Sequence, residues 1–320
     1  MKHIQFSRPS FNVDEIDLRE IQSIINNGWV CESRWVKALS NYFIENTGVQ
    51  YAIPCANCTQ GLVIAVRAAG LSGKRFALPS FTWPSTLYAL EMNGCKPIFC
   101  DIDPDTWLMD KIPEFVLRDE PDAILAVDTF GSQIELETDL PLLVDAAHGF
   151  MLPQLGHRGL IEVISLSFTK LVSAGQGAIF LTNNKDIYNI ASELIRLSAK
   201  MLEVSAYLVL KEIRNYEDKV KIRNKIINLY REQIQIPYRE QRTNFTNNSV
   251  YAIIFENQKI RDKVAQKFSD NGVEVKIYYQ PLFRGLRHTE NVFSKILALP
   301  VYPKLLENDI EFICNLINNI

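Results

Sequence analysis

The chain has 320 residues, too many for one small core, which predicts two packed domains. Hydrophobic residues make up 47% and charged residues 22%, as in an ordinary globular protein, and a net charge of −3 from 34 basic and 37 acidic residues excludes nucleic acid as the main partner. No apolar run is long enough to span a bilayer and the first ten residues lack the apolar core of a secretion signal, so we expect a cytoplasmic protein without a membrane partner.

Short apolar runs alternate with helical patterns in the first part of the chain. A helix is expected over residues 14–27, with Asp14 as its cap. Seven strands follow, and most lack the polar alternation of a half-exposed strand: 51–54, 76–78, 97–100, 123–127, 142–144, 163–166 and 178–181. Strands that alternate with helices predict an α/β fold with a mostly parallel central sheet.

The pattern changes after about residue 185. Residues 187–232 have a helical pattern, and a strand at 250–255, a helix around 259–271, a strand at 274–279 and a terminal helix after Glu307 come next. We therefore predict a larger domain over residues 1–190 and a smaller α+β domain over residues 191–320, with a long helical connection.

Six cysteines raise the question of a metal or redox site. Cys55 and Cys58 form a C-x-x-C pair, but a structural zinc site needs four ligands. There is no second pair of this kind, and no two histidines have the spacing of zinc ligands. We expect buried or half-buried thiols and no metal.

The apolar strand at 142–144 leads into a carboxylate, Asp145, which is followed by two alanines and His148. Ligands usually bind at the edge of a parallel sheet where such a residue lies. A carboxylate there can cap a helix, bind a metal or hold a cofactor nitrogen. Taken alone, the segment favours helix capping.

The next strand leads to Ser165, Thr169 and Lys170, and then to a turn that contains glycine. A single lysine is usually a solvated surface charge, but Lys170 is flanked by Phe168 and Leu171. An amine in apolar surroundings tends to lose its charge and becomes a nucleophile that can form a Schiff base.

Two further segments also follow predicted strands. Cys58 and Thr59 open an apolar helical stretch, where free backbone N–H groups can bind an anion. Trp83 follows another strand, and an aromatic side chain there can cover a flat ring by stacking. Capping and core packing explain these residues equally well when each segment is taken alone.

The four segments together match the needs of one cofactor. Pyridoxal 5'-phosphate (PLP) requires a lysine for its aldehyde, a carboxylate for its ring nitrogen, an aromatic face and an anion site. Each of these is present, and each follows a predicted strand. The combination indicates a PLP enzyme far more strongly than any one segment does.

The sequence resembles the fold-type I PLP-dependent enzymes, and specifically the nucleotide-sugar aminotransferases of the DegT/StrS family. The resemblance covers nearly the whole chain, and its most specific motifs are D-A-A-H at 145–148 and S-x-x-x-T-K at 165–170. It also includes Asn-Cys-Thr at 57–59, Pro-Ser-Phe-Thr-Trp at 79–83 and Tyr-Tyr-x-Pro at 278–281. The chain departs from the family where a cysteine replaces a common glycine at position 58, and in the short segment at 197–200.

The resemblance implies a role for each matched residue. Lys170 would form the Schiff base and move the proton, Asp145 would pair with the ring nitrogen, and Trp83 would stack on the ring. His148 would lie near the ring, and the phosphate would be bound at three positions: Cys58, Thr59 and Ser165. Three residues are candidates for the sugar side: Trp29, Arg34 and Tyr278.

The implied reaction transfers an amino group from an amino acid, expected to be glutamate, to a nucleotide-linked keto-sugar in deoxyamino-sugar or surface-polysaccharide biosynthesis. The implied assembly is a homodimer. Two alternatives stay open: a PLP-dependent sugar dehydratase, and a non-catalytic regulatory protein of the same fold. Relatives that dehydrate sugars replace the lysine by histidine, so Lys170 favours transamination.

Overall fold

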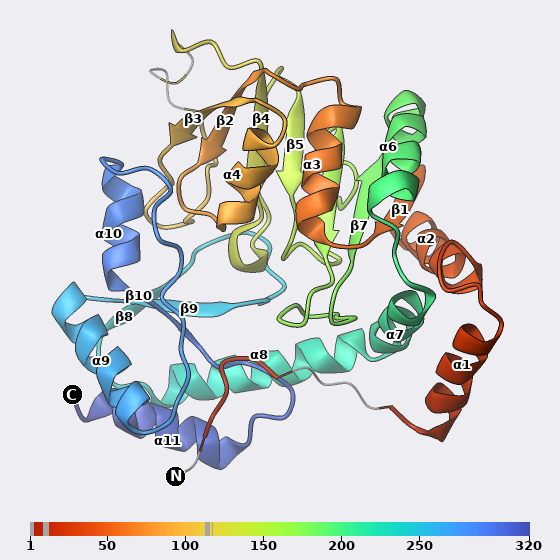
Figure 1. The fold of residues 1–320 in the computed structure, drawn as a ribbon. Coiled ribbons are helices and arrows are strands. Elements are labelled where there is room, and N and C mark those ends of the chain that lie inside the picture. Colours follow the sequence, from red (N-terminus) through yellow and green to blue (C-terminus); the bar gives the residue numbers. More distant parts are fainter. Residues whose placement is uncertain (1–2, 9–12, 113–115, 117) are drawn as a thin grey trace.

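The computed structural model describes residues 3–8, 13–112, 116 and 118–320, and its centre is a seven-stranded sheet (Figure 1). The strands of this sheet, in spatial order, are β1 (Tyr51–Cys55), β7 (Ala178–Thr182), β6 (Ile161–Ser165), β5 (Leu142–Asp145), β4 (Ala123–Val127), β2 (Arg75–Pro79) and β3 (Lys96–Cys100). A 3-10 turn, η1 (Thr129–Gly131), follows β4.

Strands β6, β5, β4, β2 and β3 are parallel to one another, whereas β7 pairs antiparallel with both β1 and β6. Strand β1 therefore runs in the same direction as the parallel strands. Strand β4 shows why the apolar runs lack alternation: Ile124 and Ala126 pack into the core on one face of the sheet, and Ala123 and Leu125 into the core on the other.

Helices cover both faces of this sheet (Figure 1). On one side lie α3 (Cys58–Ala68), α4 (Pro84–Glu91) and α6 (Lys185–Ser198), and on the other α2 (Arg34–Thr47) and α7 (Glu203–Arg214). The remaining helix, α1 (Glu15–Asn26), packs against α7, and Asp14 caps it as expected, in a capping box with Asp17.

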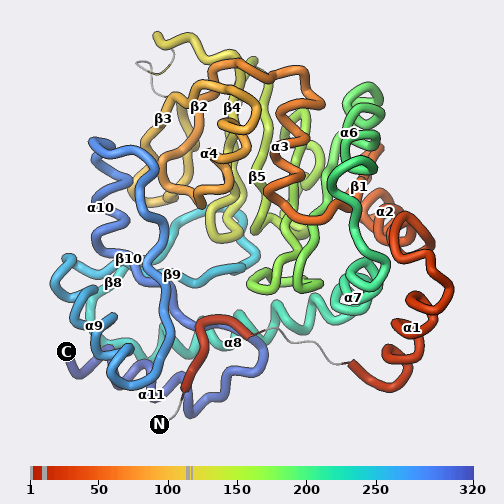
Figure 2. The backbone as a smooth tube through the Cα atoms, in the orientation of Figure 1, coloured from red at the N-terminus to blue at the C-terminus, as the bar shows by residue number. Residues whose placement is uncertain are grey.

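A smaller antiparallel sheet follows in the order β10 (Ile296–Leu299), β9 (Tyr251–Phe255) and β8 (Tyr238–Glu240). Its helices are α8 (Tyr216–Gln233), α9 (Gln258–Asp270), α10 (Arg287–Lys295) and α11 (Glu307–Asn318). One sheet face packs with α8, α9 and α11, and the other meets aromatic side chains of the larger sheet's loops, among them Phe81 and Phe130. The N-terminal segment also lies here, where Ile4 bridges to Val273 (Figure 2).

Two predicted elements are wrong. Residues 187–232 form α6, α7 and α8, because residues between α6 and α7 pair with other segments: Ala199 accepts a hydrogen bond from Ala56 N–H, and Leu202 bridges to Cys31. Residues 274–279 form no strand. The two positions beside β9 are taken by β8 and β10, which the sequence did not reveal, so this segment makes only isolated bridges, such as that of Lys276 to Ala298.

The predicted fold class is confirmed: an α/β fold with a mostly parallel sheet and a small C-terminal sheet. The division at residues 190 and 191 stays a prediction, and α6 and α7, which fall at and after it, pack against α3 and α2. The six cysteines are free and are buried or half-buried, as expected. No helix in the described part of the chain is both long and apolar enough to cross a membrane.

Candidate active site

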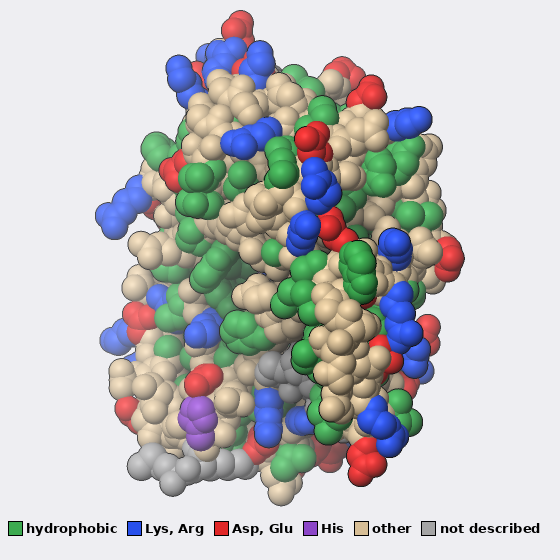
Figure 3. Space-filling view, turned by 45° about the vertical axis from the view of Figure 1, so that its right-hand side comes forward, with side chains coloured by type: hydrophobic (Ala, Val, Ile, Leu, Met, Phe, Trp, Pro, Cys, Tyr) green, Lys and Arg blue, Asp and Glu red, His purple; other side chains and the backbone are tan. Residues whose placement is uncertain are grey.

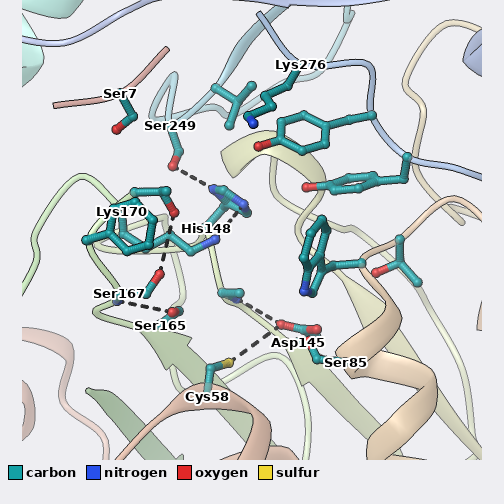
Figure 4. A pocket seen from close by; sticks show the side chains of 18 of the residues that line it. Ser7, Cys58, Ser85, Asp145, His148, Ser165, Ser167, Lys170, Ser249 and Lys276 are labelled. Atoms are coloured by element: carbon teal, nitrogen blue, oxygen red, sulfur yellow. Dashed lines mark hydrogen bonds between the residues drawn. The ribbon is translucent and has the colours of Figure 1, made fainter. Parts of the chain in front are cut away.

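A cavity of about 680 Å³ lies where strands β1, β2, β4, β5 and β6 of the large sheet end. Strands β1, β2, β5 and β6 run in one direction, so the residues that follow them meet at one sheet edge. The small sheet and α8 contribute the facing wall, through residues such as Arg223, Ser249 and Tyr278. The predicted segments are thus brought together around one hollow (Figure 4).

Lys170 follows β6, and its half-buried side chain lines this cavity. Its Nζ lies 2.7 Å from Nε2 of His148. Burial lowers the pKa of Lys170 to about 8, although the nearby Cys58 and Asp145 act in the opposite direction. A larger share of this amine is therefore uncharged at neutral pH than of an ordinary lysine, as a Schiff-base nucleophile requires.

His148 connects Lys170 to the small domain. Its Nδ1 lies 2.8 Å from the Ser249 hydroxyl, and Asn247 donates to the His148 backbone carbonyl. Burial, together with the charges of Lys170 and Arg223, lowers the pKa of His148 well below its usual value. The imidazole is thus neutral, and it can exchange a hydrogen bond with the lysine amine without carrying a charge of its own.

Asp145 ends β5 and is only 3% exposed. It accepts hydrogen bonds from the Thr86 hydroxyl at 2.7 Å and from the Ala147 backbone N–H at 3.1 Å. The Cys58 Sγ lies 4.0 Å from the same carboxylate. Burial raises the pKa of Asp145, and the bond from Thr86 opposes this rise most strongly.

The N-terminus of α3 opens into the cavity through Cys58 and Thr59. In the first turn of a helix the backbone N–H groups have no acceptor within the helix, so they can bind an anion. Gly61 lets this turn lie close to β6, because a Cβ atom there would come within 2.7 Å of Val163. Ser165, at the end of β6, also lines the cavity.

Trp83 offers an aromatic surface to the cavity. Its side chain is 57% exposed, and its ring meets Tyr278 and Tyr279 in edge-to-face contacts with centroids 6.5 and 6.4 Å apart. These contacts leave room for a flat ring to stack on the indole.

The structure brings most of the sequence-predicted site residues together, but not all of them. Eight line the cavity: Cys58, Thr59, Trp83, Asp145, His148, Ser165, Lys170 and Tyr278. Trp29 and Arg34 do not line it, and Arg34 pairs with Glu20 on the surface. Their contact with the sugar stays a prediction.

Sequence reasoning missed several polar residues of the site, among them Thr86, Ser249 and Arg223. Thr86 could have been found, because it lies four residues after Thr82, close enough for the two hydroxyls to bond at 2.9 Å. Ser249 and Arg223 carry no local signal, since they reach the cavity only through the packing of the small sheet and α8.

These residues fit PLP. The cavity holds an amine of lowered pKa, a buried carboxylate and an open aromatic face. It also holds a helix N-terminus for the phosphate. The donor set is that of a ring with a basic nitrogen, an aldehyde and a phosphate group.

Comparisons with known proteins agree with this chemistry. The model of the DegT/DnrJ/EryC1/StrS aminotransferase family matches residues 12–318. The chain is 22% identical to GDP-perosamine synthase of Escherichia coli O157:H7, with 99% of this chain and 98% of that one covered. It is 24% identical to UDP-2-acetamido-2-deoxy-3-oxo-D-glucuronate aminotransferase of Pseudomonas aeruginosa, with 96% of each covered.

A solved aminotransferase of Helicobacter pylori, involved in the biosynthesis of pseudoaminic acid, has the same fold, with a TM-score of 0.87 at 16% identity over 99% of each chain. The family match extends over nearly the whole chain, and the cavity supplies the groups that its cofactor needs. The chain therefore belongs to the DegT/DnrJ/EryC1/StrS aminotransferase family and is a PLP-dependent aminotransferase.

Proposed function

We propose that this enzyme transfers an amino group from glutamate to a nucleotide-linked keto-sugar, in the biosynthesis of deoxyamino sugars for surface polysaccharides. The observation that carries the proposal is the Lys170 amine, 2.7 Å from His148 in the cavity that also contains Asp145. The names of the two full-length relatives, a GDP-sugar synthase and a UDP-sugar aminotransferase, support the class of acceptor.

Several residues of the chain would each have a role in this reaction. When bound, PLP supplies an aldehyde that condenses with amines and a ring that accepts electrons. Lys170 would provide the amine and move the proton, and Asp145 would hold a proton on the ring nitrogen. Trp83 covers one ring face, while the phosphate is bound by Cys58, Thr59 and Ser165.

His148 has a positioning role in this account. Its neutral imidazole takes part in a hydrogen bond with the Lys170 amine and is itself fixed by Ser249. Tyr278, at the wall contributed by the small domain, is proposed to contact the sugar, together with Trp29 and Arg34. We also infer that the enzyme works in the cytoplasm as a homodimer.

The test is an assay of the purified, PLP-loaded enzyme with glutamate and a panel of nucleotide-linked keto-sugars. We expect 2-oxoglutarate to form in equal amount with an aminated sugar, and at most one equivalent per site when the sugar is left out. A sugar that loses water without release of 2-oxoglutarate would instead identify a dehydratase, and no conversion of glutamate would contradict the proposed donor.

A further inference from the structure

The cavity contains more positive than negative side chains. Among the described residues that line it, Asp145 is the acid, and the cations are Lys170, Arg223 and Lys276. Asp145 and Lys170 already have roles toward the cofactor. Arg223 and Lys276 remain, and a cation whose charged group is free can bind an anionic part of a substrate in this space.

Arg223 is not available for that group. It is buried, and its guanidinium donates to three backbone carbonyls, those of Asn248, Ser249 and Val301. These bonds fix the segment that carries Ser249 beside His148. Arg223 therefore holds the wall of the cavity together.

Lys276 differs from Arg223 because its side chain is exposed and its charged group is not hydrogen-bonded to a described residue. Its backbone is fixed by a pair of hydrogen bonds with Ala298 of β10, but its side chain is exposed. No hydrogen bond or ion pair joins its ammonium group to any residue that the structure describes. Figure 4 shows this side chain directed into the pocket, on the opposite side of His148 from Asp145.

Lys276 also stands apart from the groups assigned to the cofactor. Figure 4 shows it across His148 from Asp145, Cys58 and Ser165. The α-carboxylate of an amino acid is one carbon from the reacting amine, so it must lie near Lys170. The diphosphate of a nucleotide-linked sugar is separated from the keto carbon by the sugar ring, which suits a more distant cation.

We propose that Lys276 binds the diphosphate of the nucleotide-linked substrate. This inference rests on the proposed function, because it takes the acceptor to be a nucleotide sugar. A lysine on a fixed backbone with a free ammonium group can donate charge-assisted hydrogen bonds to phosphate oxygens as the substrate enters. The residue would thereby set the preference for a diphosphate-linked sugar over a free one.

The test compares wild-type enzyme with Lys276→Met, which keeps an apolar stem but removes the charge. The matched control is Lys263→Met, on an exposed position of α9 that does not line the cavity. With PLP bound, the dissociation constants of UDP, GDP and TDP are measured by calorimetry at two salt concentrations. For whichever of them wild type binds, Lys276→Met should raise the constant about tenfold and weaken its salt dependence.

Lys276→Arg should largely restore binding, and Lys263→Met should leave it unchanged. The conversion of bound PLP by glutamate, followed by absorbance, should be the same in all four proteins. The inference is overturned if Lys276→Met binds the nucleotides as wild type does, if it instead weakens saturation by glutamate, or if wild type binds none of them. Failure of the wild type to convert glutamate would count against the proposed donor, not against the role of Lys276.

Discussion

The charge of Asp145 depends on Thr86, which lies outside the motifs that identified the site. Its carboxylate is buried, and burial alone would favour the protonated, neutral form. The Thr86 hydroxyl donates to it at 2.7 Å and in turn lies 2.9 Å from the Thr82 hydroxyl, so α4 stabilises the charge of Asp145. An ionised Asp145 is the form that can hold a proton on the cofactor's ring nitrogen.

Thr86→Val should therefore weaken PLP binding, because valine has the same shape as threonine but no hydroxyl to donate. We expect the dissociation constant of PLP, measured by fluorescence titration of the apoenzyme, to rise about tenfold near neutral pH. The pKa of Asp145 should rise further, so as pH falls the variant should lose affinity at a higher pH than wild type.

Thr86→Ser is the control, since it keeps the hydroxyl, and it should bind PLP nearly as wild type does. A purely structural role for Thr86 would shift thermal stability but not the pH at which affinity is lost. Equal PLP affinity of Thr86→Val and wild type at every pH would remove Thr86 from the site.

At the scale of elements, helix α1 has an apolar face that no described part of the chain covers. Leu18 and Ile25 are each 59% exposed, although they share one side of the helix. Trp29, just after the helix, is also exposed. Figure 3, in which this side of the molecule is turned forward, shows apolar side chains at the surface among charged ones. Such a face is typical of a subunit contact, which supports the proposed homodimer.

Leu18→Glu should weaken this contact, because it places a charge in the centre of an apolar interface. Light scattering should give about twice the chain mass of 36.6 kDa for wild type and a mass nearer to one chain for the variant at low micromolar concentration. Ser23→Glu, on another side of α1, adds the same charge and should leave the dimer intact. A monomeric wild type with full activity would contradict the proposed assembly.

Some of the strands could be predicted from the sequence, and others could not. Most strands of the large sheet were found because both of their faces are buried, which leaves uninterrupted apolar runs such as β4. The strands of the small sheet were harder to predict. Strand β8 has three residues and β10 directly follows α10, so neither stands out, and residues 274–279 have an extended pattern without becoming a strand.

The residues of the candidate site also fall into those that the sequence predicted and those that it did not. Asp145, Lys170 and Trp83 could be predicted because each follows a strand of one direction, and parallel strands bring their carboxyl ends to one edge. Ser249, Arg223 and Lys276 come from the second half of the chain. They reach the cavity only after the small domain has packed against the loops of the large one, so local sequence carries no sign of them.

At the scale of the whole molecule, the cavity exists because the two sheets meet. Aromatic side chains of the large domain, including Phe81 and Phe130, pack against β9 and β10, and this contact sets the wall that carries Ser249 and Tyr278. The loops of the large sheet supply the lysine and the carboxylate, and segments beside the small sheet supply the partner of His148 and the cation proposed for the diphosphate. The central claim is that this assembled cavity directs PLP to one amine, that of Lys170.

That claim is tested most directly by reducing the PLP-loaded enzyme with borohydride, digesting it and locating the pyridoxyl group by mass spectrometry. The account predicts one label per chain, on the peptide that contains Lys170, and no stable label at the site in Lys170→Ala of unchanged fold. A label on another lysine of the wild-type protein, or full turnover by Lys170→Ala, would contradict it.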